Sequence, residues 1–190
     1  IIQSRLLLLF FIAFVLAGSF ASLYNYIAFY LQASHFQLSR LGIAQLSWFY
    51  LFGVGSALWG GLLLQRFKLA LLLQLALMLM LIGLLLTLSQ QLMLLLPGIA
   101  LFTGGFFAAH LVCSAWLARL IQSVKALLTA IYLTCYYLGT ALLGTASGEL
   151  WQLAGWQGLV WLLLLFLSLA LLTSYWLPNV AVENVDAGTQ

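Results

Sequence analysis

The stretch MLLLPGIALFTGGFFAAHLVCSAWL, residues 93–117, decides the fold class of this chain. It contains no Lys, Arg, Asp or Glu and is long enough for the ~20 helical residues that cross the hydrocarbon core of a bilayer. It is not uniformly apolar, because Thr103, His110 and Ser114 interrupt it. An imidazole inside a spanning helix is costly unless it faces protein or water. The stretch therefore predicts a membrane helix with a polar site on one face.

The composition extends this interpretation to the whole chain. Of 190 residues, 66% are hydrophobic and 5% are charged, against about 25% charged in soluble domains. So few charges exclude a soluble globular surface, and a net charge of +3 is too small to indicate a nucleic-acid partner. Cys113 and Cys135 both lie in apolar runs, which favours small buried side chains over a disulfide. We expect an integral protein surrounded by the lipid bilayer.

The apolar runs predict an all-α membrane protein, a bundle of six transmembrane helices. The predicted spans are residues 6–31, 41–64, 69–88, 93–117, 126–148 and 158–177. We expect residues 1–178 to form this bundle and residues 179–190 to be a disordered cytoplasmic tail. Of the six cations, all but Arg40 fall on the side of the amino terminus. Cations concentrate on the cytoplasmic side, so we expect a cell (inner) membrane protein with both termini in the cytoplasm.

The second and fifth predicted helices resemble each other. GSALWG at 55–60 aligns with GTALLG at 139–144, and the same alignment places Tyr26 on His110. We therefore expect residues 5–90 and 91–178, approximately, to be two copies of one three-helix unit. The alternative is a chance match, because small residues recur in any membrane helix. An odd number of crossings inserts the second copy upside down, and such inverted repeats are typical of transporters.

Polar and aromatic side chains are unevenly distributed among the predicted helices. The third and sixth are almost purely apolar, whereas the other four carry most of the polar groups. We therefore expect the first, second, fourth and fifth helices to surround a polar, aromatic-lined space. On the first helix, the expected polar face consists of Ser19, Ser22, Tyr26 and Tyr30.

Several segments resemble the carboxy-terminal half, helices 7–12, of a major facilitator superfamily permease, of the bacterial sugar-efflux or drug-efflux type. They are LYNY at 23–26, GGFFAAH at 104–110, YLTCYYLG at 132–139 and GLLLQRFK at 61–68. The last is similar to the family's loop signature Gly-x-x-x-Asp-Arg-x-Gly-Arg-Arg. Gly61 and Arg66 match the signature, whereas Gln65 replaces its Asp and Lys68 its second Gly.

The resemblance implies half of a twelve-helix secondary transporter. Such a protein moves a small solute by alternating access, and we expect a proton-coupled exporter, an antiporter. The implied partners are the solute, protons and a missing amino-terminal six-helix half. No metal, cofactor or nucleic acid is implied.

The candidate site residues are the polar groups that the predicted helices carry inward. Each also has a simpler structural interpretation, as an interhelical hydrogen bond, a packed ring or an interfacial anchor. Since His titrates near neutral pH, the imidazole is the candidate for proton coupling. The candidates are Asn25, Tyr26, His110, Tyr132 and Tyr136 for substrate binding, with Gly61 and Arg66 for a gate loop.

Other functions fit the sequence less well, and we do not expect an enzyme. An intramembrane serine protease needs a His on a helix after its Ser, and no His follows Ser147. Two His residues without a deep acidic residue do not make a usual zinc site, and no filter-like loop indicates a channel. A non-transporting membrane assembly subunit remains the alternative function.

Overall fold

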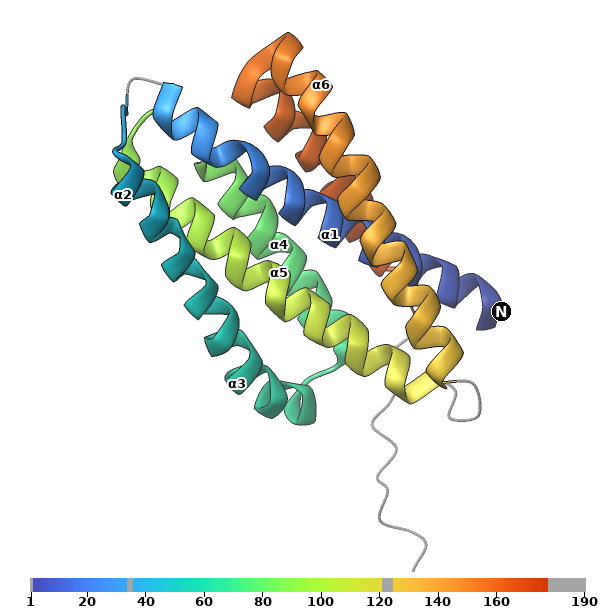
Figure 1. Cartoon of the computed structure of the whole chain (residues 1–190). Helices are drawn as coiled ribbons and strands as arrows, with labels where there is room; N and C mark the ends of the chain where they lie inside the picture. The colour runs from blue at the N-terminus through green and yellow to red at the C-terminus, as the bar shows by residue number, and fades with distance from the viewer. Residues whose placement is uncertain (1, 34–35, 121–124, 178–190) are drawn as a thin grey trace, which may run out of the picture.

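The computed structural model describes residues 2–33, 36–120 and 125–177, which form helices joined by short links and contain no strand. Figure 1 shows the helices as long rods joined by short links. Their bounds are α1 (Ile2–Ala33), α2 (Arg40–Ala44), the 3₁₀ helix η1 (Gln45–Phe49), α3 (Tyr50–Arg66), α4 (Leu69–Leu86), α5 (Leu92–Leu120) and α6 (Lys125–Ser174). The expected all-α class is confirmed.

Five helical segments among the described residues are long and apolar enough to cross a membrane. A helix suits this environment because it satisfies its own backbone hydrogen bonds where lipid offers no partner. The segments are Leu6–Ala33, Arg40–Arg66, Leu69–Leu86, Leu92–Arg119 and Ala126–Ser174. The protein is thus a multi-pass membrane protein by length and composition.

The last of these segments contains both the fifth and the sixth predicted spans. α6 breaks at Gly155, where φ is 61° and ψ is −154°, a backbone conformation that is essentially restricted to glycine. Figure 1 shows the two arms of α6, residues 125–154 and 156–174, folding back on each other. The link expected at 149–157 is wrong, because the helix continues to the single glycine that reverses the chain.

Aromatic contacts fix the two arms next to the break. Trp156 stacks on Tyr30 of α1 with ring centroids 4.8 Å apart, and its indole N–H donates to the carbonyl of Thr87, 3.0 Å away. Tyr26 stacks on Trp151 of the first arm. These contacts join the turn of α6 to α1 and to the end of α4.

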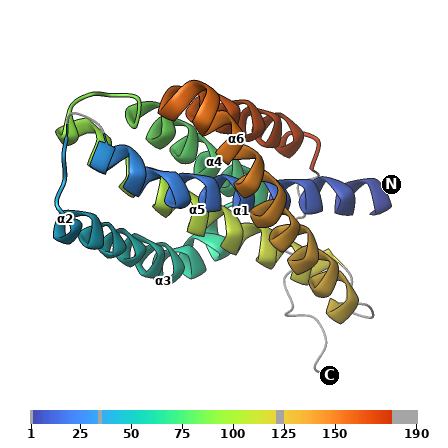
Figure 2. The same ribbon diagram turned by 45° about the horizontal axis from the view of Figure 1, so that its top comes forward.

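α1 is the central helix, and Figures 1 and 2 show it between α6 and the helices α3 to α5. Its side chains Leu9, Ile12, Leu16 and Leu23 are fully buried. Small residues let α1 and α6 approach closely, as is common for membrane helices. At Gly139, an added Cβ would overlap the backbone of Phe14.

The polar face expected on α1 is buried in this contact and does not line an open space. Ser22 Oγ lies 2.7 Å from the Gly18 carbonyl and 2.7 Å from Ser147 Oγ of α6. Ser19 is also fully buried, and its hydroxyl has no hydrogen-bond partner within the described ranges. Serine is small enough for close helix packing and can bond its own helix backbone, so this face serves packing.

The second predicted span is the least buried of the five. It extends from Arg40 to Arg66 rather than 41–64, and the tighter turns of η1 interrupt it at 45–49. Ser39 caps its start, since Ser39 Oγ accepts from the N–H of Gly42 at 3.2 Å. α3 packs on α5, where Gly53 leaves room for the ring of Phe107.

Replacing Gly139 by Ala should destabilise the protein, because the added methyl group meets the Phe14 backbone. We expect the free energy of unfolding in detergent to fall by about 1–3 kcal/mol, as for other overpacked sites. The matched control is Gly61→Ala, where an added Cβ meets no atom within 4 Å. Equal melting temperatures for the two variants would contradict the close contact of α1 with α6.

Candidate functional site

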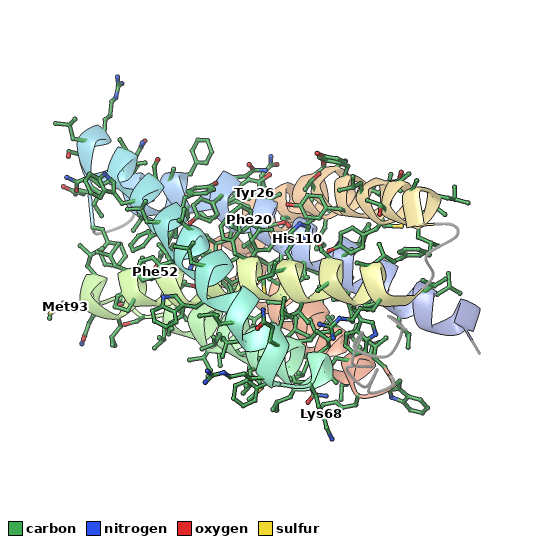
Figure 3. The ribbon with its side chains drawn as sticks, turned by 90° about the horizontal axis from the view of Figure 1, so that it is seen from below. Phe20, Tyr26, Phe52, Lys68, Met93 and His110 are labelled. Carbon is green, nitrogen blue, oxygen red and sulfur yellow. The ribbon has the colours of Figure 1, made fainter. Side chains whose placement is uncertain are left out.

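Eight rings from four helical segments form an aromatic cluster on one side of α5. Phe20 stacks on Phe106 with ring centroids 4.1 Å apart, and Tyr24 lies 5.1 Å from Tyr50. The aromatic cluster consists of Phe20 and Tyr24 of α1, Tyr50 of α3, Phe106, Phe107 and His110 of α5, and Tyr132 and Tyr136 of α6. These segments are the four that the sequence predicted to surround an aromatic-lined space. Figure 3 labels Phe20 and His110 within the cluster.

His110 is held at the junction of α5 with the first arm of α6. Its Nδ1 lies 3.0 Å from the hydroxyl of Tyr132, and its ring is 5.3 Å from that of Tyr136 and 6.2 Å from that of Phe106. A phenol hydroxyl can donate to a neutral imidazole or accept from a protonated one. The Tyr132 hydroxyl can therefore stay bonded to His110 in either protonation state.

Tyr24 is oriented by a second hydrogen bond. Its hydroxyl lies 2.8 Å from Thr103 Oγ1, and the Thr103 hydroxyl donates to the carbonyl of Ile99 at 2.7 Å. Because a hydroxyl has one proton, Thr103 accepts the proton of Tyr24. The lone pairs of the Tyr24 oxygen remain available as acceptors at the edge of the cluster.

A small pocket of about 120 Å³ lies beside His110, between α5 and the first arm of α6. Polar side chains form part of its wall. The polar lining residues are His110, Ser114, Thr129 and Tyr132, and the apolar lining residues are Leu117, Ala118 and Leu133. The pocket has room for a few waters or for one small group of a solute.

Larger grooves on the structure lie away from His110. One of about 550 Å³ runs along the outer side of η1 and α3, between Trp48, Phe52 and Trp59. Its wall is almost entirely apolar, and the residues beside it are exposed. We place the candidate site at the aromatic cluster because hydrogen-bonding groups converge there, and convergent polar groups fix a ligand's orientation.

The structure brings three of the predicted substrate-binding residues together, namely His110, Tyr132 and Tyr136. Tyr26 lies against α6 instead, with its hydroxyl 3.5 Å from the Gly144 carbonyl, and Asn25 beside it is exposed.

The two predicted gate-loop residues lie away from the cluster. Gly61 and Arg66 are exposed near the carboxyl end of α3.

Sequence reasoning did not select five members of the cluster as site residues, namely Phe20, Tyr24, Tyr50, Phe106 and Phe107. The spacing of Phe20, Tyr24 and Phe106 could have indicated the cluster, because rings at positions i and i+4 share a helix face. Phe20 with Tyr24 and Phe106 with His110 have this spacing, as do Tyr132 and Tyr136, which were selected. Tyr50 carries no such signal, since only the tertiary structure brings α3 to α1.

Curated relatives of the chain bear transporter names. It is 38% identical over 128 residues to an "Uncharacterized transporter" of Buchnera aphidicola subsp. Schizaphis graminum. It is 39% identical over 143 residues to an "Uncharacterized transporter" of Buchnera aphidicola subsp. Baizongia pistaciae. It is 34% identical over 132 residues to the "Uncharacterized MFS-type transporter YybF" of Bacillus subtilis.

These matches cover most of this chain but only part of each relative. They span 67%, 75% and 68% of the chain, and 31%, 36% and 32% of the relatives. The chain therefore spans about a third of the length of the curated relatives it matches. No family model matches it. The relatives support a transporter family of the MFS type.

Tyr132→Phe should release His110 from its hydrogen bond while keeping the ring in place. Interhelical hydrogen bonds in membrane proteins contribute about 0.6 kcal/mol and up to about 1.7, so we expect a small loss of stability. In ¹⁵N-histidine spectra, the Nδ1 signal of His110 should shift. Tyr175→Phe, at an exposed ring, is the control, and an unshifted His110 signal in Tyr132→Phe would contradict the bond.

Proposed function

We propose that the chain is the carboxy-terminal half of a secondary active transporter of the major facilitator type, which exports a small organic solute by proton-coupled alternating access. The aromatic cluster around His110 carries this proposal. It combines ring faces with neutral hydrogen-bonding groups in the middle of apolar helices, where polar groups are rare and usually functional. Transporter names among the relatives support the same class.

The missing partner is the amino-terminal half. The matched region is about a third of each relative, which leaves length for further helices. Exposed rings beside the cluster, Phe52 of α3 and Tyr137 of α6, are 52% and 65% accessible. A second bundle facing them would close the cluster into a cavity between two halves.

Within this half, we propose six spans arranged as two inverted three-helix repeats, approximately 5–90 and 91–178. The two arms of α6 supply the fifth and sixth spans. The alignment of GSALWG (55–60) with GTALLG (139–144) supports the repeat. Inverted repeats place a transporter's solute site at their interface, near the bilayer midplane.

The residues have distinct roles in this proposal. His110 takes up and releases the coupling proton, and Tyr132 keeps it oriented. Tyr136 offers its ring face to the solute, and sugars or aromatic compounds bind such faces. Asn25 and Tyr26 stay as candidate hydrogen-bonding residues nearer the outer end of α1.

The charged end of the bundle faces the cytoplasm in this proposal. Arg66, Lys68 and Arg119 are exposed at one end of the bundle, as the positive-inside rule requires for the cytoplasmic face of an inner membrane. Both termini lie on that side. Gly61 and Arg66 are part of the last turns of α3, and we propose that they act as the gate at this end of the helix.

Transport by the full-length protein tests the proposed class. In liposomes with an imposed pH gradient, we expect gradient-dependent flux of at least one compound from a panel of labelled sugars and aromatic amphiphiles. A protonophore should abolish the flux. Folded protein with no flux for any compound would instead favour the membrane assembly subunit.

His110→Ala should reduce the transported flux about tenfold, the effect of losing ~1.4 kcal/mol of binding or coupling energy. Tyr136→Ala should raise the solute concentration needed for half-maximal flux by a similar factor. Ser168→Ala, on an exposed position of the second arm of α6, is the control. Unchanged flux in both site variants would reject the aromatic cluster as the solute site.

A further inference from the structure

A second groove lies on the opposite side of α5 from the aromatic cluster. It has a volume of about 240 Å³ and an almost wholly apolar lining. α3 and α4 form its walls, and α5 forms its floor. Its lining residues include Gly60 and Leu63 of α3, Leu72 and Leu79 of α4, and Ala108 and Val112 of α5.

The groove has the length of part of a lipid acyl chain. Its lining extends from Ser56 to Leu63 on α3 and from Leu72 to Leu79 on α4. At 1.5 Å per helical residue, each wall is about 10 Å long, which is shorter than the ~15 Å depth of one leaflet of the hydrocarbon core. A groove of this length can take a single acyl chain from one leaflet.

Cations gather at one end of the groove. Arg66 ends α3 one turn beyond Leu63, and Lys68 precedes α4. Arg119 of α5 donates from Nη2 to the carbonyl of Leu64 at 3.4 Å, which joins the ends of α5 and α3. All three side chains are exposed, and Figure 3 shows Lys68 at the edge of the molecule.

No carboxylate of the described residues balances these charges. The acidic side chain within the described ranges is Glu149, which is most of a helix length from Lys125 on the first arm of α6 and therefore near the opposite end of the bundle. Within the described ranges, the end of the groove is thus a positive site with no carboxylate beside it, at the ends of three apolar helices.

We propose that this groove binds an anionic phospholipid, with one acyl chain between α3 and α4 and the headgroup phosphate at Arg66, Lys68 and Arg119. The apolar lining excludes a polar solute. The neighbouring positive charge selects an anionic over a zwitterionic headgroup, because each Lys or Arg near a membrane surface favours anionic lipid about fivefold. The proposal does not depend on solute transport.

Native mass spectrometry of the full-length protein tests the proposal. The protein is equilibrated with equal amounts of phosphatidylglycerol and phosphatidylcholine of identical chains. Wild type should retain phosphatidylglycerol preferentially. The triple variant Arg66→Gln, Lys68→Gln, Arg119→Gln should lose on the order of 100-fold of that preference. Arg40→Gln, which removes a cation at the other end of the bundle, should keep it.

A second pair of variants tests the groove itself. Ala108→Phe places a ring on the floor and should lower retention of phosphatidylglycerol at least tenfold, whereas Ser168→Phe on the exposed side of α6 should not. Circular dichroism spectra of each variant, compared with that of the wild type, serve as the test of folding.

Three results would overturn the proposal. They are a wild type with no lipid preference, a preference that survives the triple variant, and retention that is unaffected by Ala108→Phe. A wild type that retains neither lipid has no preference and counts as the first of these results.

Discussion

The absence of hydrogen-bond partners in hydrocarbon is the constraint on which the rest of this structure depends. A polar group inside these helices is costly unless it finds a partner within the chain, since lipid offers none. Among the described residues, the buried Ser19 hydroxyl is the exception. Ser22 and Ser147 meet each other at the α1–α6 contact, Tyr24 meets Thr103, and Tyr132 meets His110. Each pair joins two helices. These hydrogen bonds therefore determine which helix faces meet, in a bundle whose other contacts are mostly apolar.

The same constraint gives the aromatic cluster its chemical character. Its groups are satisfied by neutral partners, so the cluster needs no buried carboxylate or fixed cation. Rings that are stacked on one side and accessible on another can contact a ring or an apolar face of a solute. His110 is the cluster member with an imidazole, and the phenol of Tyr132 can bond it as donor or as acceptor. In the proposed function, this partner would keep α5 joined to α6 while His110 takes up and releases the coupling proton.

Sequence patterns predicted the helices well, because long apolar runs between short polar links leave few alternatives. They predicted the four segments that meet at the cluster. The structure also brings together His110, Tyr132 and Tyr136, whose role as site residues stays a prediction. The sequence patterns failed where a single residue or a single tertiary contact determines the local structure. The break at Gly155 was placed in a loop, because a lone glycine does not distinguish a flexible link from a sharp reversal. Ser19, Ser22 and Tyr26 were assigned to an open face, because periodicity shows that polar groups share a face but not which neighbour covers it.

α5 connects the two sites that the structure suggests. Phe106 and His110 point into the aromatic cluster, whereas Ala108 and Val112 lie on the floor of the apolar groove. α3 touches both sides, since Tyr50 joins the cluster and Gly60 and Leu63 line the groove. α3 is also the least buried span, and it packs mainly against α5. A lipid chain that fills the groove would support α3 from the side opposite the cluster. The position of Tyr50 would then depend on the lipid, and the shape of the candidate solute site would depend on the membrane around it.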